Sequence, residues 1–157
     1  MLVGTNISLR SLIYSDLDFL EKIENDTSLW EFGTEQIRYT RKELKSYIKN
    51  SGTDLQIAKQ FRFVVDHKSN PVGFIDLFNY KGEEVSIGII IDEGYQNRGF
   101  AKESVSLLSN YCFDNLNIKK LNCSVDVLNK KSNALFLSLG FQLVRIEENH
   151  NFYIFVR

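Results

Sequence analysis

Residues 85–101 read Val85-Ser-Ile-Gly-Ile-Ile-Ile91-Asp-Glu-Gly-Tyr-Gln96-Asn97-Arg98-Gly99-Phe100-Ala101, and this stretch decides the fold. Its first seven residues form an apolar, β-branched run of strand length. Further along, apolar residues recur at intervals of three and four, the spacing of one face of an α-helix: Ala101, Val105, Leu108 and Cys112. The sequence therefore predicts a strand, a short loop and a long helix, with Gly99 where the helix begins.

The start of that helix is suited to binding an anion. The first turn of a helix has four backbone N–H groups without a partner inside the helix, and they lie at the positive end of the helix dipole. Such a start binds phosphate groups. Gly99 has no Cβ, so a ligand can approach the backbone closely there. The helix start at Gly99 therefore suits a phosphate-containing ligand, but this short pattern by itself fits an ordinary helix start with a solvated loop better, and the rest of the chain must decide between the two.

Two common nucleotide-binding motifs do not fit this loop. Gly94 and Gly99 have the spacing of a P-loop, but Phe100 and Ala101 stand where that motif needs lysine and serine or threonine. The chain also lacks the G-x-G-x-x-G fingerprint of dinucleotide-binding proteins. The loop therefore disfavours both nucleotide hydrolysis and dinucleotide binding.

The composition is that of one ordinary globular domain, residues 1–157. Apolar residues make up 43% of the chain and charged residues 25%. The net charge of −1 gives no electrostatic reason to expect a nucleic-acid or membrane partner. No apolar run approaches the ~20 residues that span a bilayer, and the N-terminus has no basic segment followed by an apolar one. The sequence therefore predicts a cytoplasmic protein.

Metal binding is not indicated, because His67 and His150 are isolated and lack the spacing of metal ligands. Cys112 lies on the apolar face of the long predicted helix, and Cys123 lies on the apolar face of a predicted strand. Two such cysteines are typical of buried thiols rather than of a disulfide or a metal site.

The remaining elements follow from hydrophobic periodicity. Strands are predicted where apolar residues alternate or are β-branched: Ile7–Leu12, Phe61–Asp66, Val72–Tyr80, Leu121–Val127, Phe141–Glu147 and Phe152–Val156. Helices are predicted where apolar residues share a helical face: from Ser15 as N-cap to about Asn25, from a capping box at Thr40 to Asn50, and from Asn129 to Leu139. Asn25–Tyr39 has no clear period and is a predicted loop, and Pro71 marks a hairpin turn.

The order of these elements predicts the fold class. Short turns make the three strands between Phe61 and Ile91 antiparallel neighbours, whereas the strand, helix and strand that follow predict a parallel crossover. The result is an α/β domain with a mixed central sheet of about seven strands, flanked by about four helices.

Local motifs and element order together resemble one known family. Gln96, Gly99 and Ala101 form a Q-x-x-G-x-A pattern, which resembles the pyrophosphate-binding motif Q/R-x-x-G-x-G/A of the GNAT superfamily of acyl-CoA-dependent N-acetyltransferases. Asn129-Lys-Lys-Ser132 and Leu139-Gly-Phe141 resemble the N-x-x-S…L-G-F segment of the branch that contains ribosomal-protein and polyamine N-acetyltransferases. Ile7-Ser-Leu-Arg10 resembles the opening strand of that branch, and the element order resembles the GNAT fold over essentially the whole chain.

The resemblance implies acetyl-CoA as co-substrate and places its contacts. Backbone N–H groups at the start of the long helix would hold the pyrophosphate: those of Arg98, Gly99, Phe100, Ala101 and Lys102, with Gln96 and Asn97 shaping the loop. The Arg98 side chain would either add charge or face solvent. Backbone groups of Ile89, Ile90 and Ile91 would pair with the pantetheine arm as an added strand does. The Asn129 amide would bind the same arm, with Ser132 beside it.

The catalytic side chains are less clearly indicated. An alkylammonium has a pKa near ~10.4, so making it neutral at pH 7 costs roughly 4 to 5 kcal/mol. Relatives often have a glutamate base where this chain has Ser86, and many have a tyrosine acid where it has Phe136. Asp76 and Glu84 are the remaining candidates for the base, although Asp76 could equally make a structural hydrogen bond. A thiolate, with a pKa near ~8.5, can leave without much help from an acid.

The acceptor is indicated only by charge. Acidic residues concentrate in one stretch with only Lys22 opposing them: Asp16, Asp18, Glu21, Glu24, Asp26, Glu31 and Glu35. With Trp30 and Phe32 they could attract a cation such as a polyamine, although a solvated helix face explains Glu21 and Glu24 as well. We therefore favour a small primary amine as partner. The alternatives are the N-terminus of a protein such as a ribosomal protein, or a CoA-binding module without turnover. A homodimer is compatible with the sequence.

Overall fold

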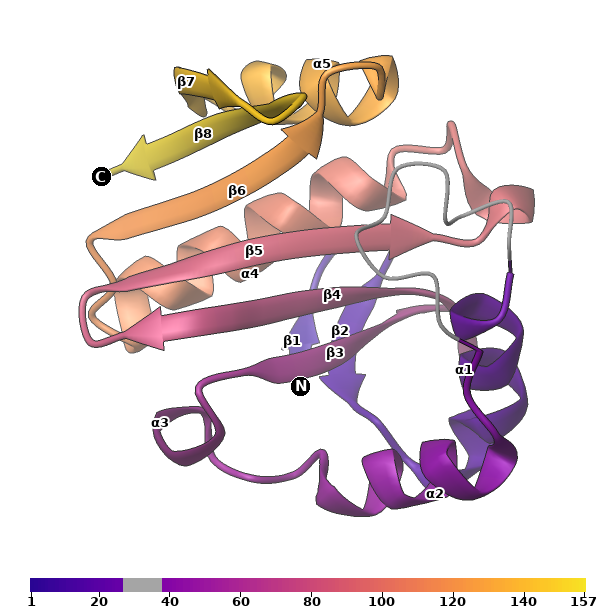
Figure 1. Ribbon diagram of the computed structural model, residues 1–157. Helices are drawn as coiled ribbons and strands as arrows, with labels where there is room; N and C mark the ends of the chain where they lie inside the picture. Colours follow the sequence, from indigo (N-terminus) through magenta and orange to yellow (C-terminus); the bar gives the residue numbers. More distant parts are fainter. Residues whose placement is uncertain (27–37) are drawn as a thin grey trace.

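The computed structural model describes residues 1–26 and 38–157, and within these ranges the chain builds one eight-stranded sheet (Figure 1). The strands, in chain order, are β1 (Leu2–Val3), β2 (Ser8–Ser11), β3 (Phe61–His67), β4 (Asn70–Lys81), β5 (Glu84–Ile91), β6 (Lys120–Asp126), β7 (Gln142–Glu147) and β8 (His150–Val156). Their order across the sheet is β1-β2-β3-β4-β5-β6-β8-β7. The α/β class and the mixed sheet predicted from the sequence are confirmed.

Five α-helices accompany this sheet in the described part of the chain. They are α1 (Leu17–Glu24), α2 (Arg41–Asn50), α3 (Leu55–Ala58), α4 (Phe100–Asn115) and α5 (Lys130–Ser138). One turn of 3-10 helix, Tyr14–Asp16, precedes α1, and another, Glu93–Tyr95, lies in the loop between β5 and α4. All four predicted helices are present, and α3 is an additional one-turn helix that its short sequence did not reveal.

The pairing between β5 and β6 is the only parallel pairing in the described sheet, and it is short. It joins Glu84–Ser86 to Lys120–Asn122. Beyond that point β5 stays with β4, whereas β6 stays with β8 in an antiparallel ladder that reaches Asp126 and His150. The two halves of the sheet therefore separate, and Figure 1 shows β6 diverging from β5 toward the C-terminal ends of both strands.

Hydrophobic packing on the two faces of the sheet holds these elements together. On one face, Val105 and Leu108 of α4 are fully buried in a cluster that includes Ile87 of β5. On the other face, helices α1 and α2 bury leucine and isoleucine side chains against Val64 and Phe74. The alternation of side chains along each strand explains why one sheet can serve both layers.

Local capping explains where the helices begin. The Thr40 side chain accepts a hydrogen bond from the Glu43 N–H at the start of α2, as the capping box predicted. Asn129 caps α5 in the same way through Ser132, and Gly99, with φ of 81°, precedes α4. Ser15 is not the N-cap of α1. Asp16 occupies the N-cap position, and it is also the last residue of a 3-10 turn that the sequence did not predict.

The hairpin turns differ slightly from the predicted ones. The turn between β3 and β4 consists of Lys68 and Ser69, both with positive φ. Pro71 itself lies in β4 opposite Asp66, so it follows the turn rather than forming it. The last turn is likewise the pair Glu148–Asn149, and β8 begins at His150 rather than at Phe152. The short strand β1 was not predicted, because two residues carry no period.

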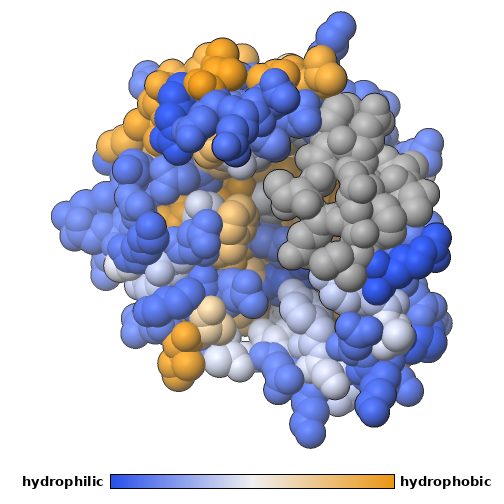
Figure 2. All heavy atoms as spheres, in the orientation of Figure 1, coloured by the Kyte–Doolittle hydropathy of each residue, from blue (hydrophilic) through white to orange (hydrophobic). Residues whose placement is uncertain are grey.

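Several apolar side chains stay exposed at the edge of the sheet formed by β7. Leu143, Val144 and Ile146 of β7 are about half exposed or more, as is Leu137 of α5. Figure 2 shows hydrophobic atoms gathered at the top of the molecule, where Figure 1 places these two elements. No helix in the described ranges is long and apolar enough to cross a bilayer.

Both cysteines are free and buried, as predicted, and they provide a test of the core. Burial raises the pKa of Cys112 and of Cys123 to about 12, whereas a cysteine thiol in an unfolded chain has a pKa of about 8.5. We expect neither thiol to react with a disulfide reagent at pH 8 until the protein is unfolded. The unfolded chain alone releases these protons between about pH 8.5 and 12, so the free energy of unfolding should fall over that range.

Denaturant unfolding at several pH values measures this pH dependence of the free energy of unfolding. A Cys112→Ala/Cys123→Ala variant, measured in the same way, shows how much of it is due to the thiols. Labelling of the native protein at the rate of a free thiol would contradict the burial of these side chains.

Candidate functional site

The gap between β5 and β6 exposes a specific set of backbone groups. The Asp92 N–H donates to the Val72 carbonyl on the β4 side at 2.8 Å, whereas the Lys120 N–H on β6 donates to the Glu83 carbonyl at 3.2 Å. Because backbone groups alternate in direction along a strand, Ile89 and Ile91 face the gap and Ile90 faces β4. Of the three isoleucines predicted to pair with the pantetheine arm, two are therefore turned toward the gap.

A cavity of about 870 Å³ opens at this gap. Every predicted cofactor-binding residue except Arg98 lines it: Ile89, Ile90, Ile91, Gln96, Asn97, Gly99, Phe100, Ala101, Lys102, Asn129 and Ser132. Further lining comes from residues that the sequence did not indicate: Glu93, Tyr95, Leu128, Lys130, Lys131 and Leu135. The structure thus brings together the two motifs, which lie some thirty residues apart in the sequence.

The start of α4 forms one wall of this cavity. Gly99 brings no side chain to cap the helix, so the first-turn N–H groups are left for another acceptor. A Cβ on Gly99 would meet nothing within 4 Å, so glycine is required here by its φ of 81° and not by crowding. The Gln96 side chain fixes the loop by donating from Nε2 to the Ile91 carbonyl at 3.0 Å.

Charge around the cavity favours an anion. Lys102, Lys130 and Lys131 line it, and among the described residues Glu93 is the one acidic residue in the lining. Arg98 does not line it. The Arg98 guanidinium lies 5.6 Å from the centre of the Tyr95 ring and 5.3 Å from that of Phe100, on the exposed side of the loop. The cationic lining is therefore made by lysines from α4 and α5.

The start of α5 forms the opposite wall. The Asn129 Oδ1 accepts a hydrogen bond from the Ser132 N–H at 3.2 Å, which makes Asn129 the N-cap of this helix. The Nδ2 group of the same side chain is the donor that can reach a ligand in the cavity. The structural role and the predicted binding role of Asn129 thus use different atoms.

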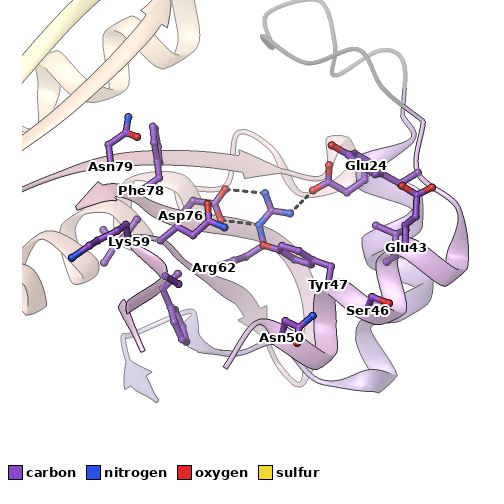
Figure 3. A pocket seen from close by; sticks show the side chains of 16 residues that line it. Glu24, Glu43, Ser46, Tyr47, Asn50, Lys59, Arg62, Asp76, Phe78 and Asn79 are labelled. Atoms are coloured by element: carbon purple, nitrogen blue, oxygen red, sulfur yellow. Dashed lines mark hydrogen bonds and ion pairs between the residues drawn. The ribbon is translucent and has the colours of Figure 1, made fainter. Parts of the chain in front are cut away.

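A second cavity, of about 880 Å³, lies on the face of the sheet that carries α1 and α2 (Figure 3). Its walls come from α1, α2, the segment after α3, β3 and β4; charged and aromatic side chains dominate: Glu24, Tyr39, Glu43, Tyr47, Lys59, Phe61, Arg62, Asp76 and Phe78. Within residues 1–26 and 38–157, three carboxylates and two cations line this second cavity, which we call the acceptor-side cavity.

Arg62 occupies the centre of the acceptor-side cavity. Its Nε and Nη2 donate to the two Asp76 oxygens at 2.7 and 2.9 Å, and Nη1 donates to Glu24. The guanidinium lies 4.8 Å from the Phe74 ring centre. Burial opposes the charge, but the nearby Asp76 carboxylate outweighs it and raises the pKa of Arg62. Figure 3 shows this arginine held between the two carboxylates.

The two base candidates lie in different surroundings. Asp76 lines the acceptor-side cavity and is the cross-strand partner of Gly88, which precedes Ile89 of the cofactor cavity. Glu84 forms an ion pair with Lys120 at 3.0 Å and lines neither cavity. It lies about 16 Å along β5 from Ile89. Phe136 is buried against Phe141, so no hydroxyl exists at the position where relatives often have a tyrosine acid.

The acidic stretch is largely paired within the protein. Asp16 is buried and bound by Arg10, Asp18 and Glu21 are bound by Arg41, and Glu24 is bound by Arg62. Arginines from other parts of the chain therefore oppose these acids, in addition to Lys22, which itself pairs with Asp92. Of these acids, only Glu24 lines the acceptor-side cavity. Trp30, Glu31, Phe32 and Glu35 lie outside the described residues.

Comparison with known proteins gives a consistent result. The family model described as an acetyltransferase (GNAT) domain matches residues 6–142. The chain is 29% identical over 151 residues to spermidine N(1)-acetyltransferase of Escherichia coli K12, covering 95% of this chain and 79% of that one. It is 28% identical to the spermidine N(1)-acetyltransferase of Vibrio cholerae, covering 94% and 83%.

Solved structures agree in fold. The crystal structure of spermidine N-acetyltransferase from Vibrio cholerae, in complex with CoA and spermine, aligns with a TM-score of 0.85 and 25% identity, covering 98% of this chain and 96% of that one. RimL, a ribosomal L7/L12 alpha-N-protein acetyltransferase solved with CoA, aligns at 0.87 with 18% identity over 98% and 96% of the two chains, which shows the shared fold alone. The chain therefore belongs to the GNAT family and is an acetyl-CoA-dependent N-acetyltransferase.

Proposed function

We propose that this enzyme acetylates a primary amine of a small polyamine, by direct attack of the amine on acetyl-CoA in a ternary complex. The observation that carries the proposal is the pair of cavities, one at the β5–β6 gap with a cationic lining and one over β3 and β4 with acidic and aromatic groups. Spermidine N-acetyltransferases among the relatives support the polyamine class.

The lining of the acceptor-side cavity fits an extended cationic chain. Glu24, Glu43 and Asp76 offer carboxylates to ammonium groups, and the rings of Tyr47 and Phe78 offer apolar and π surface to the methylene segments between them. Because Arg62 binds two of these carboxylates, the net attraction for a cation is modest. Affinity for the acceptor should therefore depend on shape and ring contacts as much as on charge.

On the cofactor side, the chain's own groups would fix the thioester. The first turn of α4 and the three lysines would hold the pyrophosphate, and the backbone groups of Ile89 and Ile91 would pair with the pantetheine arm. This arrangement directs the thioester toward Gly88 and Ile89, beside Asp76 on the neighbouring strand. Holding the two reactants together at this point lowers the activation barrier of acetyl transfer through proximity.

On the acceptor side, Asp76 would take the proton of the ammonium group, directly or through a water molecule. The neutral nitrogen then forms a bond to the thioester carbon, which gives a tetrahedral intermediate. When this intermediate collapses, the carbon–sulfur bond breaks, the thiolate leaves, and the nitrogen of the new amide releases its remaining extra proton to solvent or to the thiolate. A backbone N–H in β5 would stabilise the negative oxygen of the intermediate. Since Phe136 has no acidic group that could donate a proton, the thiolate leaves unaided or takes a proton from solvent.

A thiol-release assay with an acceptor panel tests the substrate class. We expect spermidine and spermine to be turned over, with kcat/KM at least about tenfold above that of an N-terminal peptide or an aminosugar. Turnover of N-terminal peptides in preference to polyamines would instead support the protein N-terminus as acceptor. CoA binding without turnover of any amine would support a non-catalytic CoA-binding module.

Gly99→Ala tests the anion site at the start of α4, and Gly82→Ala is its matched control. Both glycines have positive φ, and neither leaves a new Cβ anything to meet within 4 Å, so each change should cost about 1 kcal/mol of stability. Only the Cβ at Gly99 enters the space where the pyrophosphate would approach. We expect calorimetry to show CoA binding weakened about tenfold by Gly99→Ala and unchanged by Gly82→Ala. Equal affinities in the two variants would count against this site.

Asp76→Asn tests the proposed base, with Glu84→Gln as the control for loss of a carboxylate that lies in the same sheet but outside both cavities. Without a base, the rate depends on amine that is already neutral, so kcat/KM at pH 7 should fall about 100-fold and then rise steeply toward pH 10. Glu84→Gln should keep the wild-type pH–rate profile within about twofold. An unchanged profile for Asp76→Asn, with the thermal midpoint preserved, would assign this residue a structural role only.

A further inference from the structure

We propose that Asn133 is a positioning residue that sets the geometry of the α5 wall of the acetyl-CoA cavity. Its side chain makes four hydrogen bonds to three segments. Nδ2 donates to the Asp126 carbonyl at 3.0 Å and to the Asn129 carbonyl at 2.9 Å. Oδ1 accepts from Asn151 Nδ2 at 2.9 Å and from the Tyr153 hydroxyl at 2.6 Å. The inference rests on the proposed use of this cavity.

The amide of Asn133 has its full complement of partners and only one workable orientation. A carboxamide has two N–H donors and two acceptor sites on oxygen, and all four are used here. Two carbonyl oxygens on one side require the NH₂ group to face them. Tyr153 is buried, and burial raises its pKa, so its hydroxyl keeps the proton that it donates to Oδ1. Turning the amide over would place oxygen against both carbonyls.

The partners of Asn133 are the ends of the elements that frame the gap. Asp126 is the last residue of β6, and beyond Asn122 that strand has lost β5 as a neighbour and keeps only β8. Asn129 is the N-cap of α5, and Tyr153 lies in the middle of β8 opposite Cys123. Asn133 therefore ties the free end of β6 and the start of α5 to the strand that supports them.

The cavity wall depends on this tie although Asn133 itself does not line the cavity. Asn129, Lys130, Lys131 and Ser132 precede it in the first turn of α5 and do line the cavity. Their distance from the first turn of α4 is set by where α5 begins. Loss of the tie should therefore weaken acetyl-CoA binding, while the acceptor-side cavity, which lies on the other side of β5, should be unaffected.

Asn133→Ala removes all four bonds without adding a charge, and Asn110→Ala, an exposed asparagine within α4, is the matched control. We expect the Kd for CoA, measured by calorimetry, and the KM for acetyl-CoA to rise about tenfold in Asn133→Ala. The KM for the amine and kcat at saturation should stay within about twofold of wild type, and Asn110→Ala should match wild type throughout.

Tyr153→Phe removes one of the four bonds and tests the inference if Asn133→Ala does not fold. It should raise the Kd for CoA about two- to threefold. Wild-type affinity for CoA in the folded variants, or a parallel change in both KM values together with the thermal midpoint, would overturn the positioning role. A wild-type protein that fails to bind CoA would contradict the proposed function itself, so the two failures are distinguishable.

Discussion

The early end of the β5–β6 pairing is the constraint on which the rest of the structure depends. Three residues of β5 pair with β6, and then each strand keeps its other neighbour, β4 or β8, while the two separate. A backbone N–H or C=O that loses its partner inside a protein must find another acceptor or donor. The Ile91 carbonyl finds one in the Gln96 side chain, and the remaining groups of Ile89 and Ile91 that face the gap are those proposed to pair with the amide-containing pantetheine arm. The same separation gives α5 room to approach α4 across the gap.

The two cavities lie on different parts of the sheet and differ in their lining. On the α4 side, an uncapped helix start and lysines from two helices favour a phosphate group. On the α1/α2 side, Arg62 is fixed by Asp76 and Glu24, which leaves an acidic and aromatic cavity with little net charge. Because Asp76 pairs across the sheet with Gly88, the proposed base and the end of the cofactor cavity meet at one point of β5. The separation of the two cavities is what the proposed ternary complex requires.

Much of the fold follows from local sequence. The alternation of apolar residues in β3–β6, the capping box at Thr40 and the glycine before α4 are short-range signals, and each marks its element correctly. The two cofactor motifs also meet. A crossover between parallel strands places the C-terminal ends of β5 and β6 at the same edge of the sheet, and each motif follows one of these ends. Ion pairs could not be predicted in this way. Arg62 and Glu24 are 38 residues apart, so no local sequence pattern reveals their contact. For the same reason the sequence does not reveal that arginines from outside the acidic stretch pair with its acids, or that Lys130 and Lys131 line the cavity.

Hydrogen exchange of individual backbone amides, followed by NMR with and without CoA, shows whether the groups of β5 that face the gap are free to bind the cofactor. In the free protein, the Ile90 amide should exchange slowly because it pairs with β4, whereas those of Ile89 and Ile91 should exchange faster because they face the gap. CoA should slow exchange at Ile89, Ile91, Ala101 and Lys102 and leave Ile90 unchanged. Equal protection of all three isoleucines before CoA is added, or no new protection at Ile89 and Ile91 after it, would contradict the account.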